Sequence, residues 1–303
     1  MRLLLLSIYF LIFQIALSQT PAAIKFYQNG DAKSDKGDFT GGISEYSKAI
    51  SLYPKFAIAY RNRGLARYNL GQLVAAILDF NKALEIDSKD FKTYSFRGIA
   101  KDNLGQYQEA IKDFSEAISI LPNSIDYFNR GLSKYNVGEI EEAILDYTIS
   151  IALNPKYIDA YNQRGIACFD LEYHEDGILD FDKAIKLDPN SGVSYYNRGI
   201  LKNELGKGSE ALKDMQIAAK LGFESAKRWI SDSTSRKATS ESEKYAKSGA
   251  EKFEAGDFKG AIEDCSKSIS LDSNYSGAYL IRCMARVNLG MYEDAFADCS
   301  RTI

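Results

Sequence analysis

Charged side chains of opposite sign recur along this sequence about every 34 residues, with one longer step before Asp264, and they are the residues best suited to polar chemistry. The acidic members are Glu45, Asp79, Asp113, Asp146, Asp180, Asp214, Asp264 and Asp298. An arginine precedes six of these carboxylates, and the arginines are Arg63, Arg97, Arg130, Arg164, Arg198 and Arg282. A guanidinium group and a carboxylate can form a bidentate ion pair, which fixes their geometry as well as adding energy.

Amide side chains form a second recurring set. One row contains Gln28, Asn62, Asn129, Gln163 and Asn197, and another contains Asn69, Asn103 and Asn136. An amide both donates and accepts hydrogen bonds, so a row of amides can bind the backbone of an extended peptide whatever its side chains. Neighbours that could add selectivity are Arg61, Tyr68, Phe128, Tyr135 and Tyr196. For the second row the alternative is a role in local structure, because an asparagine before Leu-Gly also suits a helix end. For the first row, a role in local structure and a role in binding fit equally well.

Catalytic chemistry has little support in the sequence. The single histidine, His174, stands beside Glu175 and Asp176 in an expected turn, where a lone histidine is usually polar surface. No glycine-rich phosphate loop, nucleophile elbow or paired metal-ligand spacing is present. The net charge of -3 lacks the basic excess of a nucleic-acid groove. We therefore expect no enzyme activity, no catalytic residue, no metal, no cofactor and no nucleic-acid partner.

The elements that position these residues are two short amphipathic helices that form a hairpin, best seen in residues 57–90. The apolar period breaks at Asn69-Leu70-Gly71, where glycine supplies the left-handed backbone that ends a helix. With Ala57 as position 1, small residues fall at positions 8, 20 and 27, and aromatic residues at positions 4 and 24. Small residues let the two helices approach closely. A single hairpin cannot bury its apolar face alone, so neighbouring hairpins must stack on it.

These residues and spacings resemble the tetratricopeptide repeat (TPR) family, whose unit is about 34 residues long. The resemblance implies an all-α fold, a right-handed α-solenoid of stacked antiparallel helix pairs. In that family the first helix of each pair lines a concave face that holds peptides or protein segments. The residues expected to line such a groove are Arg61, Asn62, Tyr68, Asn69, Asn103, Asn129, Gln163, Tyr196 and Asn197.

The repeats divide the chain into two expected arrays. Six repeats begin at Ala23, Ala57, Phe91, Ser124, Ile158 and Gly192. We expect the first array, with a capping helix that contains Trp229, to cover residues 19–230. The polar residues 231–241 read as a linker or as a solvated extension of that helix. A second array of two repeats, the last truncated, is expected over residues 242–303, and the chain is expected to be a fragment or to dock a partner there.

Arginine occupies position 7 of six repeats and an acid occupies position 23 of all eight. The two exceptions at position 7, Asn29 and Ser248, lie in the first repeat of each array. We therefore predict that each arginine pairs with the acid of the preceding repeat, as in Arg97 with Asp79. Independent solvated charges are the alternative. The predicted inter-repeat ion pairs use Asp79, Arg97, Asp113, Arg130, Asp146, Arg164, Asp180 and Arg198.

Residues 1–18 differ from the rest of the chain. Arg2 precedes a short apolar run, and Ala16 and Ser18 suit cleavage before Gln19, as in a secretory signal peptide. We expect an exported protein, periplasmic or extracellular, with a membrane association only if the segment is not cleaved. Of the four cysteines, Cys168, Cys265, Cys283 and Cys299, buried thiols are the default expectation. A disulfide between Cys283 and Cys299 is the alternative within one hairpin.

The function expected from these features is that of a non-enzymatic scaffold that captures an extended segment of another protein in its concave groove. The alternative is a structural subunit of an envelope or secretion complex that uses its convex or end surfaces.

Overall fold

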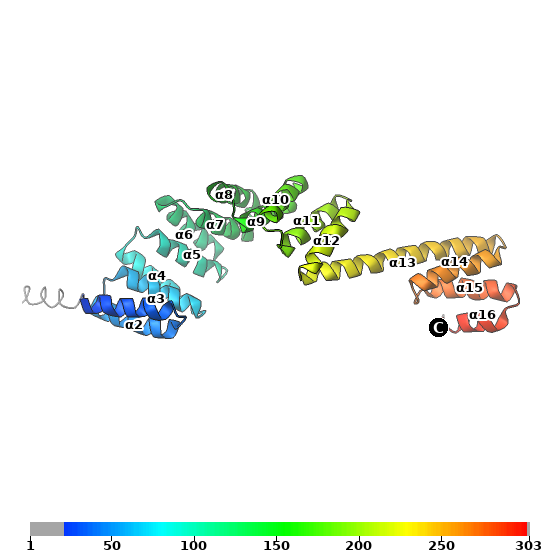
Figure 1. The fold of residues 1–303 in the computed structure, drawn as a ribbon, viewed down its shortest axis with the longest axis horizontal. Coiled ribbons are helices and arrows are strands. Elements are labelled where there is room, and N and C mark those ends of the chain that lie inside the picture. The colour runs from blue at the N-terminus through cyan, green and yellow to red at the C-terminus, as the bar shows by residue number, and fades with distance from the viewer. Residues whose placement is uncertain (1–20, 302–303) are drawn as a thin grey trace, which may run out of the picture. The chain divides into compact units, whose positions relative to one another are not determined.

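A computed structural model describes residues 21–301, and the expected signal peptide lies outside these described residues. All regular elements between residues 21 and 301 are helices. A helix covers residues 21–34, and the following helices are α2 (Phe39–Leu52), α3 (Ala57–Asn69), α4 (Leu73–Ile86), α5 (Phe91–Asp102), α6 (Tyr107–Ile120), α7 (Ser124–Asn136), α8 (Ile140–Leu153), α9 (Ile158–Asp170), α10 (His174–Leu187), α11 (Gly192–Glu204), α12 (Gly208–Lys220), α13 (Glu224–Glu254), α14 (Phe258–Leu271), α15 (Ser276–Asn288) and α16 (Tyr292–Cys299). The prediction of an all-α fold built from helical hairpins is confirmed (Figure 1).

The turn between α3 and α4 shows why each hairpin closes where the sequence predicts. Gly71 has a φ of 73°, a left-handed conformation that a residue with a side chain rarely adopts. Its N–H donates to the carbonyl of Tyr68, and the N–H of Gln72 donates to the carbonyl of Arg67, both at 2.9 Å. These bonds satisfy carbonyl groups at the end of α3, and the chain then reverses into α4.

Small residues bring the two helices of a hairpin close together. A β-carbon on Gly64 of α3 would lie only 2.7 Å from the ring of Phe80 of α4. Ala76 and Ala83 on α4 are also buried. The ring of Phe80 stacks on the ring of Phe96 of the next hairpin, with the ring centroids 6.3 Å apart. The core is therefore a series of small clusters, each shared between a hairpin and its successor.

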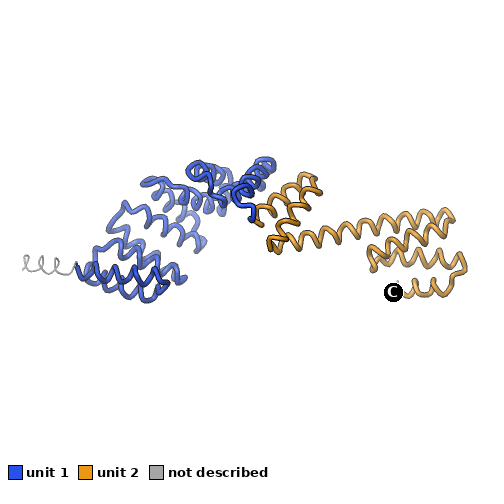
Figure 2. Tube along the Cα trace, in the orientation of Figure 1, with its two compact units in different colours: residues 1–190 blue, residues 191–303 orange. Residues whose placement is uncertain are grey.

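The described residues form two compact units, one that ends at Asn190 and one that begins at Ser191 (Figure 2). In the described part of the first unit, the second helix of one hairpin packs against the first helix of the next, as α4 does on α5, α6 on α7 and α8 on α9. The first helices also contact one another from hairpin to hairpin. This is the α-solenoid packing that the sequence predicts.

The second unit is organised around the long helix α13. Near its start, Ala226, Trp229 and Ile230 pack with Met215 and Ala218 of α12. Its last part forms a hairpin with α14, and α15 and α16 form the final hairpin. The polar residues 231–241 are helical and mostly exposed. They are thus a solvated extension of the helix and not a linker that interrupts it. The boundary between the two compact units lies at residue 190, and α13 is continuous through the polar segment. The division of the chain into two repeat arrays stays a prediction.

None of the helices between residues 21 and 301 combines the length and the apolar character that a membrane span requires.

Candidate functional site: polar links between repeats and the groove of the first helices

Each position-7 arginine binds the acid of its own hairpin. Arg97 donates from Nε to one carboxylate oxygen of Asp113 at 2.9 Å and from Nη2 to the other at 2.6 Å. The same bidentate geometry holds for Arg63–Asp79, Arg130–Asp146, Arg164–Asp180, Arg198–Asp214 and Arg282–Asp298. The prediction that each arginine pairs with the acid of the preceding repeat is therefore wrong. The acids are nearly fully buried, so the bidentate pair is also what satisfies them.

The arginine nevertheless joins successive hairpins through its third nitrogen. Nη1 of Arg97 donates to the side-chain oxygen of Asn81, in the preceding hairpin, at 2.7 Å. Equivalent bonds reach position 25 of the preceding hairpin at Ser47, Ser115, Thr148 and Ser266. This explains why Asn29 and Ser248 replace arginine: each stands in the first hairpin of its array. The polar residue that recurs at position 25 is a sequence signal for this link, and the predicted pairing did not include it.

A second cation approaches most of the buried acids from position 11. Lys134, for example, lies 2.8 Å from Asp146, which also binds Arg130. The corresponding cations on the other acids are Lys33, Arg67, Lys101, Lys202, Lys252 and Arg286. The fifth hairpin differs, because Cys168 occupies position 11. The recurrence of a cation at position 11 is also visible in the sequence, but the predicted pairing did not include it.

The difference between hairpins is visible in the pKa values of the acids. Burial raises the pKa of Asp180 in the fifth hairpin, and the hydrogen bond from Arg164 offsets this only in part. Burial acts in the same sense on Asp264, but hydrogen bonds from Lys252 and Ser248 outweigh it, so the pKa of Asp264 is lowered. The position-11 cation therefore favours the charged form of the buried carboxylate.

Each guanidinium group is also held by an aromatic ring from position 4. The group of Arg130 lies 5.3 Å from the ring centroid of Tyr127. The same pairing occurs for Arg63 with Tyr60, Arg97 with Tyr94, Arg164 with Tyr161, Arg198 with Tyr195 and Arg282 with Tyr279. A guanidinium group attracted by a ring, a carboxylate and a neighbouring hydroxyl has little freedom to turn outward.

Part of the predicted amide row holds the hairpins together. Asn62 donates to the hydroxyl of Tyr27 at 3.0 Å and to a carboxylate oxygen of Asp31 at 2.9 Å, both in the preceding hairpin. Asn103 donates to the hydroxyl of Tyr68 at 2.7 Å. These side chains are therefore engaged in links between repeats, which the sequence alone did not show.

Two other predicted groove residues are also engaged. Arg61 forms an ion pair with Asp90 at 2.7 Å. Tyr196, in the second unit, packs its ring on Phe223 with centroids 4.9 Å apart. Both side chains are therefore held by contacts within the protein.

Three other amides of the first row, Asn129, Gln163 and Asn197, are half-buried, and Gln28 is exposed. Among residues 21–301, the side chains of Asn129, Gln163 and Asn197 have no hydrogen-bond partner. Asn129 and Gln163 lie on α7 and α9 of the first unit, whereas Asn197 lies on α11 of the second. Half-buried amides with unused donors and acceptors are the groups that a peptide backbone could satisfy.

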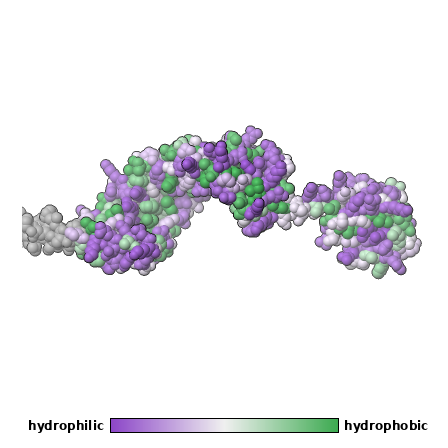
Figure 3. All heavy atoms as spheres, viewed as in Figure 1, coloured by the Kyte–Doolittle hydropathy of each residue, from purple (hydrophilic) through white to green (hydrophobic). Residues whose placement is uncertain are grey.

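Two hollows lie between first helices at the start of the first unit. One, of about 250 Å³, is bordered by the engaged Asn62, by the exposed Asn69 and by Asp31, Ser34 and Asp35. The other, of about 140 Å³, is apolar and is lined by Leu65, Tyr68, Phe96 and Ile99. Figure 3 shows polar and apolar side chains interspersed over the drawn face of this unit. The first helices thus offer polar and apolar recesses close together.

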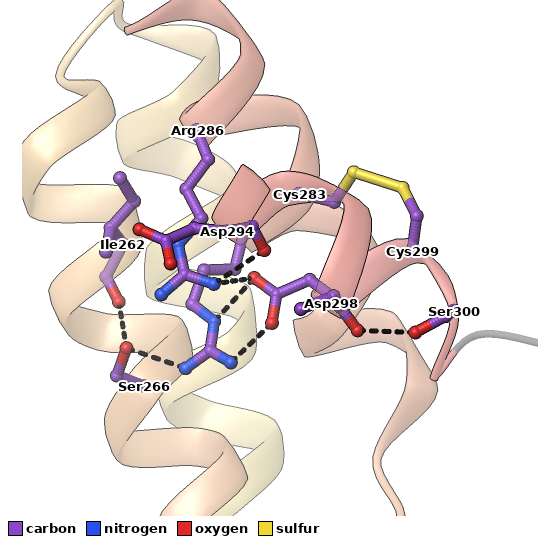
Figure 4. Close-up of polar contacts among 10 residues, drawn as sticks. Ile262, Ser266, Cys283, Arg286, Asp294, Asp298, Cys299 and Ser300 are labelled. Atoms are coloured by element: carbon purple, nitrogen blue, oxygen red, sulfur yellow. Dashed lines mark hydrogen bonds and ion pairs between the residues drawn. A yellow bond between two sulfur atoms is a disulfide. The ribbon is translucent and has the colours of Figure 1, made fainter. Parts of the chain in front are cut away.

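The last hairpin carries a disulfide between Cys283 and Cys299 (Figure 4). These residues occupy positions 8 and 24, where other hairpins pack an aromatic ring on glycine, as Phe80 does on Gly64. The default expectation of buried thiols is wrong for this pair and holds for Cys168 and Cys265, which are buried and free. Beside the disulfide, Asp298 binds Arg282 and Arg286, so the polar link is retained.

His174 is the first residue of α10, and its ring lies 5.6 Å from the ring of Phe169. Its neighbours Glu175 and Asp176 are exposed. In the part of the chain that the structure describes, no cluster of histidine, cysteine and acidic side chains has the arrangement of a metal site.

Comparison with known proteins agrees with this geometry. Family models described as Tetratricopeptide repeat match residues 27–91, 91–124 and 158–191. No curated protein matches the chain. A crystal structure of MamA is 27% identical, with a TM-score of 0.51, over 53% of this chain and 94% of the MamA chain.

Two further solved structures share the fold. YrrB, a TPR protein with an unusual peptide-binding site, is 22% identical with a TM-score of 0.52, over 58% of this chain and 91% of its own. The pilF protein of Pseudomonas aeruginosa is 18% identical with a TM-score of 0.58, over 68% and 91%. The hairpin geometry, the repeated contact positions and the matched segments show that residues 27–124 and 158–191 of the chain are tetratricopeptide repeats.

Proposed function

We propose that this protein is an interaction scaffold that binds an extended segment of another protein along the first helices of its first unit. The observation that carries the proposal is the pair of half-buried amides, Asn129 and Gln163, which have no partner among residues 21–301. An extended peptide presents unpaired N–H and C=O groups, and an amide side chain can satisfy one of each.

The recesses at the start of the first unit suit the side chains of such a peptide. The apolar hollow lined by Leu65, Tyr68, Phe96 and Ile99 could take an aliphatic or aromatic side chain. Asp31 and Asp35 border the other hollow, so a cationic side chain would be favoured there. The similarity to YrrB, which has a peptide-binding site, supports the proposal.

The test is selection of 12-residue peptides from a random displayed library on residues 21–301, followed by measurement of affinity. We expect the selected peptides to lose about tenfold or more in affinity when Asn129→Ala and Gln163→Ala are combined, since two buried hydrogen-bonding groups of the peptide lose their partners. The matched control is Asn190→Ala, an exposed amide in a loop. Equal affinity of the double variant and the wild type, with both folded by circular dichroism, would exclude this groove.

Export of the protein is part of the same proposal. It is supported by the sequence of residues 1–18 and by the Cys283–Cys299 disulfide, since disulfides persist in oxidising compartments. Thiol counting on the denatured, unreduced protein isolated from its native source should find Cys168 and Cys265 free and the other pair blocked. Four free thiols would contradict this part of the proposal.

A second candidate function is assembly through the last hairpin. Phe296 and Tyr292 of α16 are 79% and 69% exposed, which is unusual for aromatic side chains on neighbouring turns of a helix. Exposed aromatic side chains of this kind fit a structural subunit of a larger complex. Replacement of both by serine should then abolish assembly while leaving peptide binding unchanged.

A further inference from the structure

The fifth hairpin contains a hollow beside its buried acid, Asp180. The hollow has a volume of about 360 Å³, and its lining residues come from α8, α9 and α10 and from Tyr173, just before α10. Its lining includes Arg164 and Cys168 from α9 and Asp176, Leu179 and Asp180 from α10. It is distinct from the recesses between first helices, because α8 and α10 are second helices of their hairpins.

The preceding hairpin shows what normally occupies this place. Asp146 accepts two hydrogen bonds from Arg130, and Lys134 places its ammonium group 2.8 Å from Oδ2. Two cations thus share one buried carboxylate. The same arrangement recurs around Asp79, Asp113, Asp214 and Asp298.

In the fifth hairpin the first cation is present and the second is missing. Arg164 binds Asp180 at 2.8 and 2.6 Å and reaches back to Thr148 at 2.9 Å, as in the other hairpins. Cys168 stands where Lys134 stands one hairpin earlier. Among residues 21–301, Asp180 has no ion pair apart from that with Arg164. The side chain of Asp180 is 8% exposed, so it borders the hollow without being open to bulk water.

The chemistry of the walls matches a long aliphatic cation. Tyr173 and Leu179 are 54% and 64% exposed at the rim and offer apolar surface for a methylene chain. Asp180 lies at the inner end, and Asp176 adds a second negative charge at the exposed edge. The thiol of Cys168, whose pKa burial raises to about 11, stays neutral at pH 7 and neither repels nor replaces a cation.

We propose that this hollow binds a lysine side chain of a partner protein, whose ammonium group takes the place beside Asp180 that position-11 cations occupy in the other hairpins. The stem of the lysine lies along Leu179 and Tyr173. The site is separate from the proposed peptide groove and does not depend on it.

The test uses N-acetyl-lysine N-methylamide as the probe and the norleucine analogue, which lacks the ammonium group, as the matched control ligand. Binding to residues 21–301 is followed by NMR through the backbone amide signals of Thr148, Cys168 and Leu179. We expect saturable shifts with the lysine probe and at least tenfold weaker binding of the norleucine analogue. Equal binding of the two ligands, or no saturable shift at these amides, would overturn the proposal.

Variants of the site sharpen the result. Cys168→Lys supplies the missing cation from within and should abolish probe binding, whereas Asn190→Ala, at an exposed loop residue outside the lining, should leave it unchanged. Asp176→Asn, which is exposed and should fold normally, should weaken binding several-fold. Probe binding that persists in a folded Cys168→Lys variant would contradict the site. The double variant Asn129→Ala, Gln163→Ala should bind the probe normally, so failure of the groove and failure of this site are distinguishable.

Discussion

The ring of Phe80 occupies the space in which a β-carbon on Gly64 would stand, with Cε1 at 2.7 Å from that position. The same relationship joins Gly98 to Phe114 and Gly131 to Tyr147, so one close contact is repeated inside successive hairpins. The last hairpin replaces the contact with the Cys283–Cys299 disulfide at the same two positions. The small residue at position 8 is therefore required by the close approach of the two helices, and not by backbone flexibility.

Replacement of Gly64 by alanine should destabilise the protein although alanine is the better helix former. The preference for alanine is worth about 1 kcal/mol, whereas forcing extra volume into a packed contact costs about 1–3 kcal/mol. We expect a net loss of about 1 kcal/mol in the free energy of unfolding, measured by urea denaturation. Gly208→Ala is the matched control, because no atom lies within 4 Å of its added β-carbon. Equal effects of the two substitutions would contradict the packing argument.

The link between Arg130 and Ser115 should appear as an energetic coupling between hairpins. A double-mutant cycle of Arg130→Lys and Ser115→Ala should give a coupling of about 0.5–1.5 kcal/mol, the range for one hydrogen bond. Lysine keeps the charge but cannot reach the carboxylate and the hydroxyl together. The control cycle pairs Arg130→Lys with Ser119→Ala, a serine that bonds only a carbonyl of its own helix. A coupling of similar size in the control cycle would show that the effect is not specific to the link.

Glu172 is the one residue with a side chain among those with positive φ between residues 21 and 301, at 63°. Glycine occupies the corresponding place in the other hairpins, for example Gly138 at 85°. Because a left-handed conformation costs a non-glycine residue about 1–2 kcal/mol, Glu172→Gly should stabilise the protein by about 0.5–1 kcal/mol. The reciprocal substitution, Gly138→Glu, should destabilise it by about 1 kcal/mol or more. Thermal unfolding of both variants checks the prediction, and a loss of stability in Glu172→Gly would contradict it.

Asp180 and Asp264 should make opposite contributions to the pH dependence of stability. An acid whose pKa is lowered in the native state, such as Asp264, stabilises the fold above its unfolded value of about 3.9, and this contribution is lost as the pH falls through the native value. Asp180 has a raised pKa, so its contribution declines as the pH rises from about 3.9 through its native value.

Carboxyl carbon NMR titration of the two residues measures these shifts directly. In the Cys168→Lys variant, the new ammonium group should move the pKa of Asp180 downward, as Lys252 does for Asp264. The titration of Asp264 in the same sample is the internal control. An Asp180 that titrates below the ordinary value in the wild type would contradict the assignment.

The hairpin itself was predictable from the sequence, because Gly64, Ala76 and Phe80 are spaced as two close helices require. The partner of each arginine was not. Arg97 stands between Asp79 and Asp113 at nearly equal distances along the chain, so only the direction of the side chain decides between them. The polar residue at position 25, such as Asn81, carried the information on the preceding hairpin.

The candidate groove was predictable in outline and not in detail. The amides were expected to act together, but Asn62 is engaged by Tyr27 and Asp31 from the preceding hairpin, whereas Asn129 has no such neighbours. Contacts between successive repeats depend on the stacking geometry, which a spacing rule does not contain. Helix α13 likewise continues through residues 231–241 because packing at both of its ends fixes its direction, although its middle is polar.

The guanidinium bonds to position 25 all point the same way along the chain, from each hairpin to the one before it. Shortening the first unit from its carboxyl end would leave every surviving arginine with its partners. Shortening it from the amino end would remove the position-25 partner of the first remaining arginine. Arg97, for example, would lose its hydrogen bond to Asn81. These links therefore have one direction along the chain. Hairpins can be added at the carboxyl side without changing the partner of any position-7 arginine already in place.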